Sequence, residues 1–238
     1  MPEAPIERVL VVTAHPDDVD FGAGGTIASF TDAGIAVTYC IVTDGDAGGI
    51  DFEATREEVA ALRRTEQRAA GAVLGVDDIR FLGYRDGELT VSHELRRDIS
   101  RVIRQVRPQR MLIQSPDRNW DRIYASHPDH LAAGEAAIFA IYPDARNPFA
   151  HRSLREDEGL EAWTVPEVWV FGTPTPNHWV DVTEHLDRKL GALRAHASQT
   201  DHDLDMENRV RTWMSKQAGD AGLAEGRLAE AFKVVVTG

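Results

Sequence analysis

The segment that most constrains this chain is an apolar run over residues 9–12 (VLVV), which stops at the polar cluster His15-Pro16-Asp17-Asp18. A short, uninterrupted run of aliphatic residues is typical of a buried strand in a parallel sheet. In open α/β sheets, ligands bind just beyond the carboxyl ends of the strands. The run therefore predicts a strand that carries one imidazole and two carboxylates to the place where this architecture binds its ligands.

Strand-like and helix-like segments alternate along the rest of the chain. Apolar runs predict further strands over 35–43, 79–82, 110–114, 168–171, 179–182 and 232–236. Helical periodicity predicts one helix that follows the glycine-rich turn 22–25 and ends near Gly34, and others over 53–74, 92–106, 127–141, 186–197 and 203–216. We expect a single domain, 1–238, with a Rossmann-like, open, mainly parallel sheet and helices on both faces.

Composition limits the classes of function. The formal net charge of −13 disfavours binding to nucleic acid, so a small-molecule partner is expected, either neutral or met by a local basic patch. The single cysteine, Cys40, lies in an apolar run and is expected in the core. The sequence has neither a signal-like start nor a run of about 18 apolar residues, which predicts no membrane insertion and a cytoplasmic location.

A second polar cluster, His127-Pro128-Asp129-His130, follows the fourth expected strand. In the common doubly wound order 3-2-1-4-5, strands one and four are neighbours. The two clusters, about 110 residues apart, should then meet at one crevice at the carboxyl ends of those strands. Turn and capping chemistry explains either cluster alone, but their joint position at that crevice favours a shared site.

The residue types in the two clusters suit a divalent metal ion. His15, Asp18 and His130 offer two imidazoles and one carboxylate, a set that binds Zn²⁺ and leaves one position open for water. The same set also suits Fe²⁺, so the residues do not select the metal. The pattern predicts a metal-dependent hydrolase.

Three further residues of the clusters are left for proton transfer. A water molecule at a metal needs a base, and an amide leaving group needs a proton donor. Asp17 can take the first role and His127 the second. Asp129 could orient His127 and raise its pKa, so that the imidazole holds its proton.

Other loops follow expected strands and could line the same crevice. Asp44 lies in a glycine-rich loop, where substrate contact and turn formation are both reasonable interpretations. Asp86 lies in the loop after 79–82. Arg63 stands one helical turn from Glu66, a spacing typical of an exposed ion pair. Segment 142–166 has no clear pattern, and a flap or rim over the site is one interpretation.

Several motifs together resemble those of the PIG-L/LmbE-like de-N-acetylase family. They are AHPDD, GGTIA, TDG, RRTE, LGV, FLGYRDGEL and HPDH, spread over residues 9–141, with a further echo, DVTEHLDRKLGALRAHASQ, over 181–199. The resemblance implies a Zn²⁺-dependent hydrolase that acts on N-acyl groups, typically N-acetylglucosamine attached to another moiety. The family's metal ligands map onto His15, Asp18 and His130.

The resemblance also implies roles for the remaining site residues. The family's general base maps onto Asp17, and its acid or oxyanion-stabilising histidine onto His127. Arg63 and Asp86 match substrate-contacting positions. Some family members carry a tyrosine two positions before the HPDH histidine, where this chain has Ala125, with Tyr124 beside it. Either a shifted loop brings Tyr124 into the site, or His127 stabilises the oxyanion alone.

Three alternatives to an amino-sugar deacetylase follow from the same residues. The substrate could be a larger amide, such as a thiol conjugate or an N-acylated natural product. The fold could instead serve as a non-catalytic ligand-binding module. The ligand set also suits a mononuclear Fe²⁺ oxygenase, although Asp17 has no evident task in that chemistry.

Overall fold

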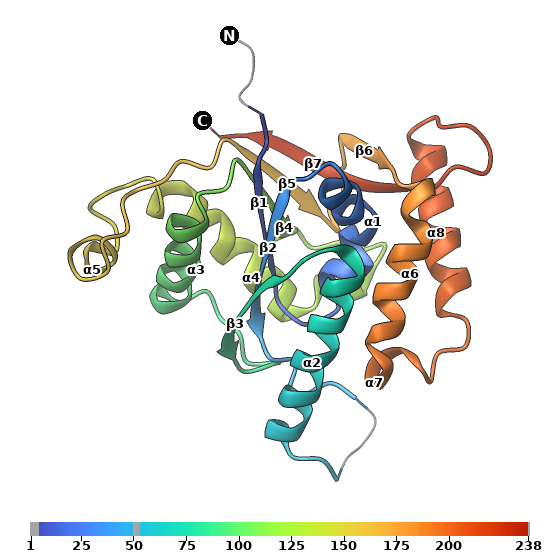
Figure 1. Cartoon of the computed structure of the whole chain (residues 1–238), viewed down its shortest axis with the longest axis horizontal. Helices are drawn as coiled ribbons and strands as arrows, with labels where there is room; N and C mark the ends of the chain where they lie inside the picture. The colour runs from blue at the N-terminus through green and yellow to red at the C-terminus, as the bar shows by residue number, and fades with distance from the viewer. Residues whose placement is uncertain (1–4, 50–52, 238) are drawn as a thin grey trace.

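The computed structural model describes residues 5–49 and 53–237, and in these residues the strands form one sheet in the order β3-β2-β1-β4-β5-β7-β6 (Figure 1). The first five strands are parallel, whereas β7 runs antiparallel to both of its neighbours. The strands are β1 (Arg8–Thr13), β2 (Ala36–Thr43), β3 (Asp78–Tyr84), β4 (Arg110–Gln114), β5 (Glu167–Phe171), β6 (His178–Asp181) and β7 (Ala229–Val236). The expected Rossmann-like order is confirmed.

Helices cover both faces of the sheet, which explains why β1 is an unbroken apolar run. Val9 and Val11 pack into the core beneath α1, α2 and α6, while Leu10 and Val12 pack against α3 and α4 on the opposite face. Cys40 is buried, as expected. The helices are α1 (Asp18–Asp32), α2 (Arg56–Leu74), α3 (His93–Val106), α4 (Pro128–Phe139), α5 (Arg152–Glu156), α6 (Leu186–Ala195), α7 (Ala197–Thr200) and α8 (Met206–Asp220), with short turns η1 (Ile123–Ser126), η2 (Ala140–Asp144) and η3 (Thr183–His185).

Helix α2 shows how local chemistry sets an element boundary. It begins at Arg56, later than the apolar pattern indicates, because Thr55 and Glu58 form a reciprocal capping box. The helix ends at Gly75, which adopts the left-handed conformation at the C-cap.

Segment 142–166 packs on α3 and does not cover the site. Arg104 of α3 donates hydrogen bonds to backbone carbonyls of this segment, including those of Asp144 at 3.1 Å and Asn147 at 2.9 Å. Figure 1 places α5 beside α3, at the far end of the molecule from α6 and α8. The interpretation of the segment as a flap is therefore wrong, because its polar backbone is held by a buried arginine elsewhere.

A buried ion pair joins three elements on the other side of the sheet. Lys189 of α6 lies 2.6 Å from Glu230 of β7, and both side chains are fully buried. The Glu230 carboxylate also accepts the N–H groups of Gly25 at 2.9 Å and Thr26 at 2.7 Å, inside α1. These contacts fix α1, which begins at the first polar cluster, against α6 and β7.

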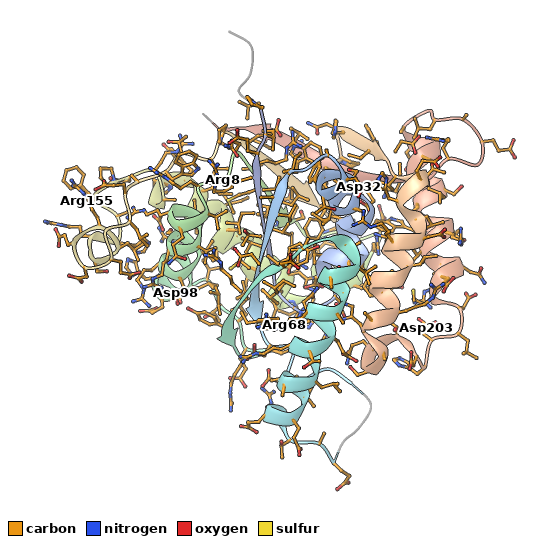
Figure 2. All side chains as sticks on the ribbon, in the orientation of Figure 1. Arg8, Asp32, Arg68, Asp98, Arg155 and Asp203 are labelled. Atoms are coloured by element: carbon orange, nitrogen blue, oxygen red, sulfur yellow. The ribbon has the colours of Figure 1, made fainter. Side chains whose placement is uncertain are left out.

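Apart from buried groups such as the Lys189–Glu230 pair, many charged side chains lie at the surface of the molecule. In Figure 2, Arg155 lies at the outer edge near α5 and Asp203 at the opposite end, while the layers between sheet and helices are densely filled. Over the ranges that the structure describes, each helix is too short or too polar to cross a lipid bilayer.

Candidate metal centre and substrate cleft

The two His/Asp clusters meet at the carboxyl ends of β1 and β4, which are adjacent and parallel. His15 follows β1, and His127 and His130 lie at the start of α4. The ring centroid of His15 is 4.9 Å from that of His127 and 5.1 Å from that of His130. The convergence expected from strand order is therefore present.

The two clusters bring two imidazole nitrogens and the two oxygens of the Asp18 carboxylate close together. His15 Nδ1 lies 3.2 Å from His130 Nε2 and 3.3 Å from Asp18 Oδ2, and His130 Nε2 lies 3.0 Å from Asp18 Oδ1. Two ligands about 2.0–2.1 Å from a tetrahedral metal ion lie about 3.3 Å apart. The spacing of the three donors therefore fits a three-ligand metal centre.

The other ring nitrogen of His15 faces two carboxylates. Its Nε2 lies 3.1 Å from Asp129 Oδ2 and 3.1 Å from Asp86 Oδ1. In the neutral ring, a proton on Nε2 would serve both carboxylates and leave Nδ1 free of a proton, the form that binds a metal. Burial alone would lower the pKa of His15, but the surrounding carboxylates, Asp18 foremost, raise it to about 12. The site thus strongly favours a positive charge at this position.

Asp129 contacts a different histidine from the one expected. Its carboxylate lies against His15 and accepts the N–H of Gly87 at 2.7 Å, whereas its backbone N–H donates to His127 Nδ1 at 3.2 Å. Although Asp129 itself favours the charged ring, burial and the neighbouring histidines lower the pKa of His127 overall, so the expected net rise does not occur. His127 Nδ1 is an acceptor, which leaves the proton of the neutral ring on Nε2.

Asp17 lies beside the three donors and is held there by α2. Its φ of 82° is in the left-handed region that residues other than glycine rarely adopt. Its N–H donates to Gln67 Oε1 at 2.8 Å, and Arg63 Nη2 donates to its Oδ2 at 3.0 Å. Burial raises the pKa of Asp17 to about 6 against the opposing charge of Arg63, which suits a general base near neutral pH.

A chain of buried polar groups continues behind Gln67. Its Nε2 donates to Asp20 Oδ2 at 2.9 Å, and His196 Nε2 lies 2.8 Å from the same oxygen. All three side chains belong to fully buried residues. His196 belongs to the AHASQ stretch, whose Ser198 also donates to Glu66 through its N–H and its hydroxyl, each at 2.7 Å. Sequence reasoning noted this stretch but did not connect it to the site.

Arg63 and Glu66 do not form the exposed ion pair that their spacing indicates, because both are buried and use other partners. Arg63 donates to the carbonyl of Gly45 at 3.0 Å. A Cβ at Gly45, where φ is +61°, would lie 2.3 Å from Arg63 Nη1, so the close approach requires glycine. Asp44 makes a two-point ion pair with Arg64 at 2.8 and 2.5 Å and lines neither compartment described below.

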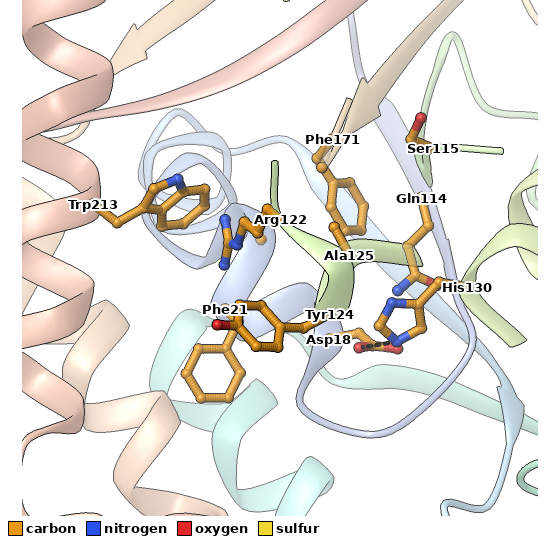
Figure 3. Close-up of a pocket in the computed structure, with 12 residues that line it drawn as sticks. Asp18, Phe21, Gln114, Ser115, Arg122, Tyr124, Ala125, His130, Phe171 and Trp213 are labelled. Carbon is orange, nitrogen blue, oxygen red and sulfur yellow. Dashed lines mark ion pairs between the residues drawn. The ribbon is translucent and has the colours of Figure 1, made fainter. Parts of the chain in front are cut away.

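Two compartments adjoin the donor set: one is lined by all three donor residues and the other by Asp18 and His130, and Tyr124 lines both. The polar compartment, of about 630 Å³, is further lined by His15, Asp17, Ala47, Gly48, Arg63, Asp86, Gly87, Ile123, Ser126, His127 and Pro128. The aromatic compartment, of about 190 Å³, is further lined by Phe21, Gly22, Gln114, Ser115, Arg122, Ala125, Phe171, Gly172 and Trp213 (Figure 3). Tyr124 thus stands at the boundary between them, with 78% of its surface exposed.

Together, the doubly wound sheet and the His–Asp–His donor set beside a separate aspartate are those of a metal-dependent hydrolase. Residues 10–141 match the PIG-L family, described as GlcNAc-PI de-N-acetylase. The match spans more than half of the chain, and this chain belongs to that family. The resemblance seen in the motifs is confirmed.

Relatives of known name extend the comparison beyond the matched segment. The chain is 37% identical over 203 residues to diacetylchitobiose deacetylase of Thermococcus kodakarensis, covering 84% of this chain and 72% of that protein. It is 35% identical over 200 residues to a probable N-acetyl-alpha-D-glucosaminyl L-malate deacetylase 2 of Bacillus anthracis, covering 81% of each. The structure of N,N'-diacetylchitobiose deacetylase from Pyrococcus horikoshii has a TM-score of 0.89 at 32% identity, covering 97% of this chain and 84% of that one.

Proposed function

We propose that this protein is a zinc-dependent de-N-acetylase that releases acetate from an N-acetylglucosamine unit joined to another group. The relatives from Thermococcus kodakarensis and Bacillus anthracis are named as deacetylases of two such compounds, which supports the reaction class. The observation that carries the proposal is the position of Asp17 beside the triangle of donors formed by His15, Asp18 and His130.

We assign His15, Asp18 and His130 as the residues that would hold the Zn²⁺ ion. When bound, the ion would polarise the acyl oxygen and lower the pKa of a water molecule. Asp129 and Asp86 support this assignment, because their contacts with His15 Nε2 favour the tautomer whose Nδ1 faces the other two donors. Fe²⁺ would suit the same donors.

Other residues of the polar compartment move the proton and stabilise the developing charge. Asp17 accepts the proton of the attacking water, and its raised pKa of about 6 fits that task. His127 lines the same compartment, and its Nε2–H donates a hydrogen bond to the developing oxyanion, while the proton that Asp17 has taken from the water passes to the leaving amine. Tyr124, at the boundary of the two compartments, carries a hydroxyl group that offers a second hydrogen-bond donor beside the N–H of His127.

The sugar ring occupies the polar compartment in this proposal. Asp86 lines it and presents a carboxylate that can accept hydroxyl hydrogen bonds from the sugar. Arg63 forms part of the wall, where its main effect on the substrate is indirect, because its Nη atoms are already committed to Asp17 and to backbone carbonyls.

The test is an amine-release assay on N,N'-diacetylchitobiose with protein stripped of metal by a chelator and then reloaded with Zn²⁺. Turnover should disappear on stripping and return on reloading. Asp17→Asn should bind the same amount of zinc and lose about 100- to 10,000-fold in kcat. Asp121→Asn, in an exposed loop, is the matched control and should behave as the wild type. Near-normal turnover by Asp17→Asn would rule out the assigned base.

A further inference from the structure

The aromatic compartment is larger than an acetyl group requires. It has a volume of about 190 Å³, whereas a cavity of about 150 Å³ holds a benzene molecule. Asp18 and His130 line it as well as the polar compartment. A substrate whose amide lies at the metal centre can therefore extend into it with a further group of ring size.

The walls of this compartment are aromatic and come from distant parts of the chain. Phe21 belongs to α1, Phe171 ends β5 and Trp213 lies on α8, while Tyr124 belongs to η1. Figure 3 shows these rings arranged around one space, with the ion pair between Asp18 and His130 at its side. Such walls pack well against the CH groups of a carbon skeleton but offer it few hydrogen bonds.

One cation lines this aromatic space. The Cζ atom of Arg122 lies 4.3 Å from the ring centroid of Trp213, and Figure 3 shows the two side chains together at the end away from His130. In the ion pairs of the described residues, Arg63 and Arg64 have carboxylate partners and Arg122 has none. The aromatic walls partly desolvate the guanidinium and lower the pKa of Arg122, although much of the residue stays exposed.

We propose that the aromatic compartment binds the group attached to the amino sugar, and that this group carries a carboxylate that contacts Arg122. A guanidinium that packs over an indole and has no carboxylate partner can bind a carboxylate through two parallel hydrogen bonds. Because the chain has a net charge of −13, its overall field repels an anion, and a local cation must provide the attraction.

The inference rests on the proposed function and narrows its substrate class to N-acetylglucosamine conjugates of a small carboxylic acid. The names of the two relatives give one substrate of each kind, neutral and acidic. Diacetylchitobiose carries no carboxylate, whereas the malate conjugate does. Because Arg122 lacks a carboxylate partner among the described ion pairs, we expect this chain to prefer the conjugate that carries a carboxylate.

The experiment compares kcat/KM of the zinc-loaded enzyme on N-acetylglucosaminyl L-malate and on N,N'-diacetylchitobiose. The wild type should prefer the malate conjugate, and added salt should reduce that preference. Arg122→Gln should lower kcat/KM for the malate conjugate by about 10- to 100-fold, mainly through KM, and change that for diacetylchitobiose by less than about 3-fold. Arg122→Lys keeps the charge and loses the planar fork. Its kcat/KM for the malate conjugate should lie between those of the wild type and of Arg122→Gln.

Arg118→Gln is the matched control, because Arg118 stacks on Trp120 in the same loop and does not line the compartment. It should leave both substrates unaffected. An equal loss on both substrates in Arg122→Gln, or a wild-type preference for diacetylchitobiose, would overturn the inference while leaving the deacetylase assignment intact. If the wild type released no amine from either compound, the proposed function itself would fail, and this inference with it.

Discussion

The side-chain oxygen of Gln67 accepts the backbone N–H of Asp17 at 2.8 Å, although the two residues are 50 positions apart. Asp17 holds a left-handed backbone conformation that costs an ordinary residue about 1–2 kcal/mol. Asp20 fixes the amide of Gln67 in one orientation by accepting its N–H, and His196 in turn holds Asp20. The proposed base is therefore positioned from α2 and, through it, from the segment that precedes α7.

Replacing Gln67 should impair turnover more than it impairs binding. Gln67→Leu leaves the Asp17 N–H without its acceptor, and we expect kcat to fall about 10-fold with KM and zinc content unchanged. Steady-state kinetics on diacetylchitobiose and metal analysis provide the measurements. Gln105→Leu, which alters an exposed glutamine bonded to Arg80, is the matched control. Unchanged kcat in Gln67→Leu, even with reduced stability, would contradict the positioning role.

Replacing Asp129 should weaken metal binding through His15. Asp129→Asn removes the carboxylate that holds the Nε2 proton of His15, and substitutions of this kind reduce metal affinity about 10- to 100-fold. Competition with a chromophoric chelator measures the zinc dissociation constant directly. Asp121→Asn should leave it unchanged. Wild-type affinity in Asp129→Asn would show that His15 does not depend on this partner.

Breaking the buried pair of Lys189 and Glu230 should strongly destabilise the fold. Lys189→Met leaves a buried carboxylate without its cation, and such changes reduce the free energy of unfolding by about 3–5 kcal/mol. The double variant with Glu230→Gln should recover much of that loss. Lys216→Met, at the exposed pair with Asp220, is the matched control and should cost less than about 1 kcal/mol. Urea denaturation distinguishes these outcomes, and equal effects at both lysines would refute the prediction.

Asp144 should contribute stability that acid removes. Burial would raise the pKa of this carboxyl, but its contacts with Arg96 and His151 lower it below the ordinary value. A group with a lowered native pKa stabilises the fold above its unfolded-state pKa of about 3.9, and that contribution is lost as pH falls through the native pKa. The difference in unfolding free energy between wild type and Asp144→Asn should therefore shrink from neutral pH to about pH 3. A gap that stays constant would disagree with this assignment.

The strand order and the meeting of the two clusters could be predicted from sequence because both follow from local patterns and a common topology. The alternation of Val9 and Leu10 between two buried faces produces an unbroken apolar run. Once β1 and β4 are taken as neighbours, His15 and His130 must lie at the same edge of the sheet.

The hydrogen bonds and packing contacts between the site residues could not be predicted in the same way. The residues around Asp129 in the sequence do not indicate that its carboxylate contacts His15. That orientation depends on an N–H group of the loop after β3, which the carboxylate also accepts. His196 reaches Asp20 across 176 positions, a pairing that no periodicity reveals. Trp213 lies on a mainly polar helix, and only the packing of α8 brings its indole to the aromatic compartment.

The place of β7 between β5 and β6 determines when the sheet can be completed during synthesis. A ribosome releases β5, β6 and α6 before β7, so the edge of β5 stays open and Lys189 lacks its counter-ion until Glu230 has emerged. The layer that supports α1, and with it the start of the metal centre, is therefore completed late in synthesis. A nascent chain stalled before residue 229 would carry all the site residues named above and still lack the strand that secures them.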